Sequence, residues 1–165
     1  GLLMLQLARL SGAALVAVSE PVAAKREEAK RLGADICFDP FAVSEDAFVA
    51  ECEKYNFDCV IECAGNVKTI GQAIRAAGKK ATVMMFGLTK PDEIVSVKPY
   101  DVFSKELTLR SSYINPYTQA RALALIESGR VDVVSMLCPA IPLEKLFEVL
   151  SDEKMREKGK YVVQL

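Results

Sequence analysis

Residues 1–20, GLLMLQLARLSGAALVAVSE, decide how the rest of this chain is interpreted. Leucines recur through residues 2–10 in a pattern that predicts a buried helix, apolar around most of its circumference, and Gly12 suits its C-terminal end. Residues 13–18 form a short apolar run without alternation, which is typical of a parallel strand covered on both faces. Glu20 follows this strand. The stretch therefore predicts a helix, a buried strand and then a carboxylate at the carboxyl edge of a sheet.

The distance from Gly1 to Glu20 resembles a dinucleotide-binding fingerprint. In that motif an acidic residue about 20 residues after G-x-G-x-x-G binds the hydroxyls of the adenosine ribose. Only the last glycine, Gly1, is present in this sequence. We therefore interpret the chain as a fragment that begins one residue before a helix, with Gly1 as the remaining cofactor-binding glycine. The alternative is that Gly1 is an arbitrary start and Glu20 is a surface acid.

The composition is that of a folded domain without a strongly charged face. Of 165 residues, 51% are hydrophobic and 26% are charged, which is ordinary for a globular protein with a sizeable core. The 21 basic and 22 acidic side chains are interspersed. This balance argues against nucleic acid or a membrane surface as a partner. The apolar start at residues 1–10 lacks a basic flank and is too short to span a bilayer.

Cysteine and histidine usage limits the chemistry of this chain. There are five cysteines and no histidine. An odd number of cysteines in apolar patterns indicates reduced thiols in a cytoplasmic protein. Cys59 and Cys63 lie on one predicted strand, where residues four apart are separated by roughly 13 Å, too far to share a zinc ion. We therefore expect no metal site and no catalytic residue in this sequence.

Helices and strands are predicted to alternate through the first half of the chain. Helices are expected at 22–32, ended by Gly33, from Ser44 as cap to about 55, and at 67–77; strands are expected at 34–38, 57–65 and 80–86. Such alternation predicts parallel pairing through right-handed crossovers. The predicted fold class is therefore α/β, a doubly wound, mostly parallel sheet with helices on both faces.

The pattern changes after Leu88. We expect an extended piece at 94–97, a short helix at 100–105 and a strand at 107–113, which Asn115-Pro116 ends. Helices at 117–128 and 143–150 and a strand at 160–164 follow. We predict two parts: residues 1–114 as an N-terminally truncated dinucleotide-binding domain, and residues 115–165 as a segment that packs on it and completes the catalytic domain of the parent protein.

The expected strand order has a gap at its centre. In the doubly wound order 3-2-1-4-5-6 the first strand is central, and the sequence begins after it. The strands at 13–19 and 57–63 should therefore flank an open position instead of pairing directly with each other.

Several segments in order resemble the medium-chain dehydrogenase/reductase family, above all its zinc-dependent alcohol, polyol and threonine dehydrogenases. They are Glu20, the helix KREEAKRLGAD at residues 25–35, the strand FDCVIECAG at residues 57–65 and VMMFGL at residues 83–88. The resemblance covers nearly the whole chain. It implies a Rossmann fold, NAD as cofactor and an alcohol or polyol as the small-molecule substrate of the parent.

The resemblance also implies which residues bind the cofactor. Glu20 and Lys25 would contact the adenosine ribose, where a negative charge favours NAD over NADP. Ala64 and Gly65 would be small residues at a strand end that leave room for the adenosine half, and Phe86, Gly87 and Leu88 would lie beside the nicotinamide. The backbone at Ser112 and Ile114 would hold the carboxamide, and Lys160 would be a base near the pyrophosphate.

The family places its catalytic zinc, zinc ligands and proton relay in an N-terminal domain that this sequence lacks. The parent would transfer hydride between an alcohol and the nicotinamide, whereas this fragment alone would be inactive. The alternatives are a zinc-free quinone or enoyl reductase of the same superfamily, a non-catalytic nucleotide-binding or self-association module, and a methyltransferase-like sheet. The resemblance also implies a homo-oligomer, dimer or tetramer, joined near residues 107–113.

Overall fold

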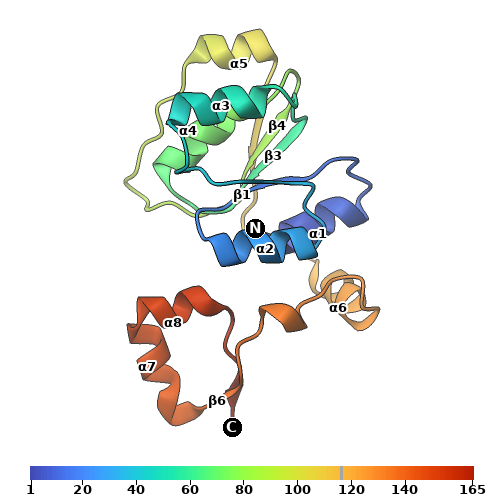
Figure 1. The fold of residues 1–165 in the computed structure, drawn as a ribbon, viewed down its shortest axis with the longest axis vertical. Coiled ribbons are helices and arrows are strands. Elements are labelled where there is room, and N and C mark those ends of the chain that lie inside the picture. The colour runs from blue at the N-terminus through green and yellow to red at the C-terminus, as the bar shows by residue number, and fades with distance from the viewer. Residues whose placement is uncertain (116) are drawn as a thin grey trace. The chain divides into compact units, whose positions relative to one another are not determined.

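A computed structural model describes residues 1–115 and 117–165, with the backbone alone at positions 153, 156 and 157. These residues form two compact units, Gly1–Gln119 and Ala120–Leu165. The first unit contains parallel sheets and the helices that pack on them (Figure 1). Its helices are α1 (Leu2–Leu10), α2 (Ala23–Arg31), α3 (Glu45–Glu53), α4 (Val67–Ala76) and α5 (Pro99–Lys105), and its strands are β1 (Ala17–Ser19), β2 (Ile36–Phe38), β3 (Cys59–Glu62), β4 (Thr82–Met85) and β5 (Thr108–Ser111).

The strands pair in parallel, as the alternation of helices and strands predicts. β1 pairs with β2, with Ala17 opposite Ile36, and β3, β4 and β5 form a second sheet in that order. In this sheet Glu62 lies opposite Met85, which in turn lies opposite Ser111. Within the described ranges no ladder joins β1 to β3. This is the arrangement that the doubly wound order predicts.

Local signals in the sequence place the ends of the helices correctly. α1 and α2 are each followed by a glycine in the left-handed region, with φ of 89° at Gly12 and 103° at Gly33. The Ser44 hydroxyl accepts a hydrogen bond from the Ala47 amide at 3.3 Å and caps α3. Asn66 caps α4 in the same way through the Thr69 amide at 3.0 Å.

The first predicted strand is wrong in its length. Residues 13–16 are outside β1, and the strand is not covered on both faces, because Ala17 and Val18 are half-buried and Ser19 is exposed. Arg9 explains the late start, since its guanidinium donates to the carbonyls of Ala13 at 3.1 Å and Ala14 at 3.3 Å. The burial expected for α1 applies only in part: Leu5 is buried, but Leu3 remains 45% exposed.

Other predicted strands also shorten to the residues that have a partner strand. β3 covers only Cys59–Glu62 of the predicted 57–65, and β4 only Thr82–Met85 of the predicted 80–86. The extended piece at 94–97 forms no strand, although Val95 packs against the core. Strand length is thus decided by the parallel register, which the apolar runs do not reveal.

The core of the second sheet lies between β3, β4 and α4. Ile70, Ala73 and Ile74 of α4 are buried together with Val83 of β4, and Val60 packs against them. These three positions lie on one face of α4, as expected for an amphipathic helix that packs on a sheet. A second cluster joins Phe48, Val49 and Cys52 of α3 to Ala76. α3 and α4 are therefore packed directly on one another.

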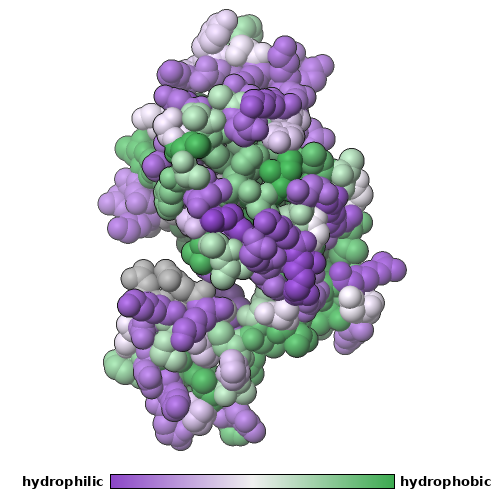
Figure 2. Space-filling model, viewed as in Figure 1, coloured by the Kyte–Doolittle hydropathy of each residue, from purple (hydrophilic) through white to green (hydrophobic). Residues whose placement is uncertain are grey.

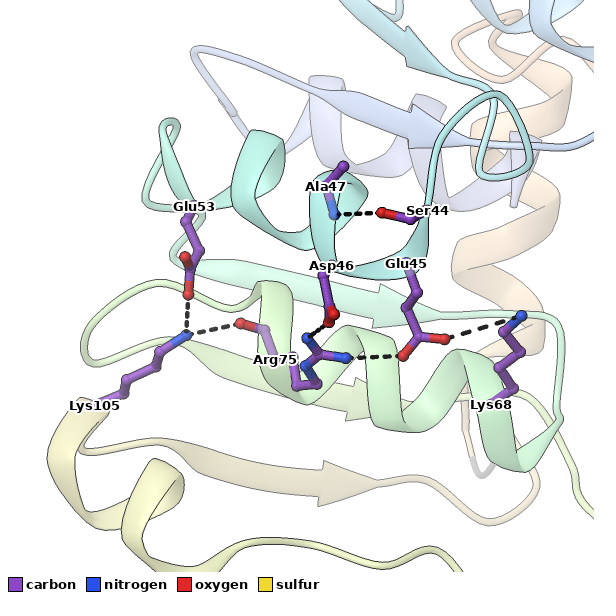
Figure 3. A network of polar contacts seen from close by, with 8 residues as sticks. All are labelled: Ser44, Glu45, Asp46, Ala47, Glu53, Lys68, Arg75 and Lys105. Carbon is purple, nitrogen blue, oxygen red and sulfur yellow. Dashed lines mark hydrogen bonds and ion pairs between the residues drawn. The ribbon is translucent and has the colours of Figure 1, made fainter.

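Charged side chains tie α3 to α4 at the surface (Figure 3). Arg75 donates to Glu45 at 2.9 Å, and Lys68 of the same helix also approaches Glu45. The Lys105 ammonium donates to the carbonyls of Arg75 at 2.7 Å and Ala77 at 3.0 Å. A cation at these carbonyls compensates the negative end of the helix dipole, so Lys105 stabilises the end of α4.

The second unit consists of short elements. They are α6 (Gln119–Glu127, which begins in the last residue of the first unit), η1 (Val134–Met136), β6 (Ile141–Pro142), η2 (Leu143–Lys145), α7 (Leu146–Ser151), α8 (Glu153–Lys158) and β7 (Val163–Gln164). β6 and β7 pair in parallel. The sequence predicts α6, α7 and β7 but misses η1, β6 and α8. Pro116, predicted as a strand breaker, lies outside the described residues.

None of the helices in the described ranges is long and apolar enough to cross a membrane.

Candidate cofactor site

The predicted binding residues of the first unit follow the ends of its parallel strands. Gly65 comes after β3, Gly87 after β4, and Ser112 after β5. Since these strands are parallel and adjacent, the residues that follow them lie at one edge of the sheet. The carboxyl edge is where open α/β sheets bind ligands. The structure thus brings together the predicted positions at residues 64–65, 86–88 and 112, and Ile114 follows two residues after Ser112.

Gly65 and Gly87 are in direct backbone contact at this edge. A β-carbon on Gly87 would lie 2.2 Å from the Gly65 nitrogen, and one on Gly65 would lie 2.6 Å from the Leu88 carbonyl oxygen. Gly65 also has a φ of 72°, which side-chain-bearing residues rarely adopt. Glycine at both positions therefore allows the turns after β3 and β4 to meet backbone to backbone at the carboxyl edge, where the sequence places the cofactor.

Large side chains surround the two turns and are exposed. Phe86 is 49% exposed, Leu88 is 92% exposed and Ile114 is 71% exposed. Ile114 also has a φ of 58°, an uncommon conformation for a β-branched residue. Phe86 and Leu88 thus present an exposed apolar surface on either side of Gly87.

The sequence analysis missed Glu62, although its position carried a signal. Glu62 ends β3 and is buried, with 5% of the residue exposed. Its Oε1 accepts hydrogen bonds from the Ala64 amide at 2.8 Å and the Gly65 amide at 2.9 Å, and from the Thr69 hydroxyl at 2.7 Å. A charged residue inside the apolar run CVIEC could have marked it.

Glu20 follows β1 and is half-buried. Its Oε1 accepts a hydrogen bond from the Val22 amide at 3.0 Å, so the carboxylate sits at the start of α2. Lys25 is half-buried in the first turn of α2. Figure 2 shows hydrophilic side chains gathered over α2. Glu20 thus lies at the end of β1, and Lys25 lies in the helix that follows it.

Arg26 is a second residue that the sequence analysis missed. Its guanidinium donates to the carbonyls of Glu20 and Pro21, each at 2.7 Å, and forms an ion pair with Asp39 at 3.0 Å. Arg26 thereby holds the segment between β1 and α2. Because Asp39 pairs with it, this cation is already engaged within the protein.

The two remaining predicted residues are placed differently. Gly1 precedes α1, and its carbonyl accepts the Leu5 amide at 2.9 Å. Lys160 belongs to the second unit, where its side chain is exposed and its amide donates to the Met136 carbonyl at 2.9 Å. The structure describes Lys160 only within that unit, where Lys160 forms an isolated parallel bridge with Leu137.

The described residues do not fit a zinc ion. Among them, no three Cys, Asp or Glu side chains come close enough to hold a metal. Burial raises the pKa of the Cys52 thiol to about 11, so this thiol favours the neutral form, which is a poor metal ligand and nucleophile. We therefore derive no metal-dependent step for this chain.

Comparisons with known proteins point to one family. The sequence model described as zinc-binding dehydrogenase matches residues 1–128. Sorbitol dehydrogenase of Gallus gallus is 27% identical over 99% of this chain and 46% of its own length. L-threonine 3-dehydrogenase of Pyrococcus horikoshii is 31% identical over 81% of this chain and 39% of its own. The chain thus spans about half the length of such relatives, or less.

A solved structure of a similar protein has the same fold over nearly the whole chain. A zinc-binding dehydrogenase from Sinorhizobium meliloti, bound to NADP in the crystal, is 33% identical with a TM-score of 0.93. The match covers 99% of this chain and 49% of that one. It confirms the α/β, Rossmann-like fold predicted from the sequence.

Proposed function

This chain belongs to the zinc-binding dehydrogenase family, as its resemblance to medium-chain dehydrogenases predicts, and from that premise we propose that it is the cofactor-binding part of an oxidoreductase. The parent protein transfers hydride between an alcohol or polyol and a nicotinamide cofactor. The observation that carries the proposal is the contact between Gly65 and Gly87, which joins the turns after β3 and β4 at the carboxyl edge of the sheet.

In this proposal the chain's own residues hold and orient the cofactor. The Glu20 carboxylate accepts hydrogen bonds from the adenosine ribose, and Lys25 contacts the same ribose. The adenosine half lies against Ala64 and Gly65, and the nicotinamide lies beside Phe86, Gly87 and Leu88. The backbone at Ser112 and Ile114 orients the carboxamide. When bound, the nicotinamide ring supplies the hydride chemistry. Zinc belongs to residues of the parent outside this sequence.

We propose NAD as the preferred cofactor. A carboxylate at Glu20 would repel a 2′-phosphate, and the nearby guanidinium of Arg26 is engaged with Asp39. The runner-up is an NADP-dependent, zinc-free quinone or enoyl reductase. The Sinorhizobium relative is a zinc-binding dehydrogenase that is bound to NADP, so an NADP-dependent dehydrogenase is a further alternative.

The partners and the division of the chain are part of the same proposal. Residues 1–114 form the cofactor-binding domain, and residues 115–165 complete the catalytic domain of the parent; the first compact unit ends a few residues later, at Gln119. We propose a cytoplasmic homo-oligomer, dimer or tetramer. β5 supports this because it is the last strand of its sheet and its residues are exposed, so its outer edge can pair with another copy.

Calorimetric titration of the full-length protein with NAD and with NADP tests the proposal. Tighter binding of NAD supports an NAD-dependent dehydrogenase. Tighter binding of NADP would overturn the proposed preference for NAD. A folded protein that binds neither would overturn the proposal and favour a non-catalytic module.

A further inference from the structure

Glu62 connects the two turns of the candidate cofactor site. Its backbone carbonyl accepts hydrogen bonds from the Phe86 amide at 3.0 Å and the Gly87 amide at 2.8 Å, where the chain leaves β4. Its side chain binds the Ala64 and Gly65 amides, where the chain leaves β3. One residue therefore fixes both strand ends.

The second carboxylate oxygen of Glu62 is unusual. Oε2 is buried and has no hydrogen-bond partner among the described residues. It faces Gly87, since a β-carbon on that glycine would lie 2.7 Å from Oε2. A buried acceptor without a donor costs free energy, and such exceptions in folded proteins call for an explanation. Oε1 satisfies three donors, whereas Oε2 adds no hydrogen bond from the described residues to the stability of the fold.

We propose that Glu62 is a positioning residue that sets the spacing of the Gly65 and Gly87 turns for cofactor binding. This inference rests on the proposed function. Oε1 gathers the amides of one turn, the Glu62 carbonyl gathers those of the other, and Oε2 lies against the Gly87 backbone. Thr69 completes the arrangement from α4, because its hydroxyl donates to Oε1. Glu62 acts on the cofactor through these turns and does not need to touch it.

Two substitutions separate the contribution of the Glu62 charge from that of the hydrogen bond donated by Thr69. Glu62→Gln keeps the shape and one acceptor oxygen but removes the charge and places an amide nitrogen beside Gly87. Thr69→Val keeps the β-branched shape and removes one donor, and it lies outside both turns. Glu51→Gln and Thr108→Val are matched controls, because Glu51 pairs with Lys54 after α3 and Thr108 lies at the amino end of β5, opposite Thr82.

Titration of the full-length variants with NAD and NADP measures the dissociation constant and the number of sites. We expect Glu62→Gln to raise the dissociation constant of the preferred cofactor about tenfold, because the hydrogen bonds to Oε1 lose their charged acceptor. We expect Thr69→Val to raise it about threefold, because one hydrogen bond to the carboxylate is lost. The number of sites per folded chain should stay at the wild-type value. The two controls should bind like the wild type.

The possible outcomes distinguish the inference from the function on which it rests. A purely structural role for Glu62 would lower the number of sites without changing the dissociation constant, and that result would overturn the inference. So would wild-type affinity in Thr69→Val together with Glu62→Gln. A wild-type protein that binds neither cofactor would overturn the proposed function, and the inference with it.

Discussion

Gly87 lies so close to Gly65 that a β-carbon on Gly87 would stand 2.2 Å from the Gly65 nitrogen. No ordinary contact is this short, so any side chain at Gly87 must push the β3 and β4 turns apart. The Gly87 amide is also bound to the Glu62 carbonyl at 2.8 Å, which limits how far the turn can move.

Gly87→Ala should therefore weaken both folding and cofactor binding. Overpacking of this kind costs roughly 1–3 kcal/mol of folding free energy. Thermal unfolding and cofactor titration of the full-length variant would measure the two effects. Gly71→Ala on α4 is the matched control, because a β-carbon there meets nothing within 4 Å. If Gly87→Ala and Gly71→Ala had equal stability and equal cofactor affinity, the predicted clash between Gly87 and Gly65 would be wrong.

Glu20→Ala should weaken NAD binding by roughly 1–3 kcal/mol, the scale of hydrogen bonds to a charged group. The preference for NAD over NADP should fall as well, since the repulsion of a 2′-phosphate is lost. Glu20→Gln separates the two effects, because its amide oxygen can still accept the Val22 amide. If Glu20→Ala left NAD affinity and the NAD/NADP ratio unchanged, the assignment of Glu20 to the ribose would be wrong.

The Arg9–Asp35 pair should make stability depend on acid pH. The hydrogen bond from the Val16 amide, and then that from Arg9, holds the pKa of the Asp35 carboxyl below its usual range. A lowered folded-state pKa stabilises the protein above the unfolded-state pKa of about 3.9, and this stability is lost as the pH falls through the folded-state value.

Urea unfolding of wild type and Asp35→Asn between pH 3 and pH 7 would test this dependence. The wild type should be the more stable protein at pH 5 to 7, and the difference should shrink as the pH falls below about 4. Asp92→Asn, at an exposed turn, is the control. A difference between wild type and Asp35→Asn that does not change with pH would rule out the ionised pair as its cause.

The outer edge of β5 should carry the association of two copies. The Thr108 amide donates inward to the Ala81 carbonyl at 3.0 Å, so the amide of Leu109, the next residue, points to the free edge. Leu109→Pro removes that donor and leaves the inward ones. Sedimentation should show a dimer or larger wild-type protein and a dissociated Leu109→Pro variant, while Leu109→Ala, which keeps the amide, should stay associated. A wild-type monomer at micromolar concentration would refute the proposal.

The sequence alone determined the class of fold and the positions of most elements in the first unit. The helix ends marked by Gly12, Gly33 and Ser44 depend on interactions within one or two helical turns. They can therefore be predicted without knowing the rest of the chain. The alternation of helix and strand then restricted the sheet to parallel pairing, because each crossover returns the chain in the same direction. Glu20 could be located at a strand end on the same grounds.

Only the tertiary structure decided where the strands begin and end and how the turns meet. The contact between Gly65 and Gly87 depends on the register that sets Glu62 opposite Met85, and no local pattern contains that register. The burial of Glu62 likewise arises from packing between segments distant in sequence, whereas its neighbours alone suggest an isolated charge in an apolar strand. Local rules therefore predict the elements, and long-range packing builds the site.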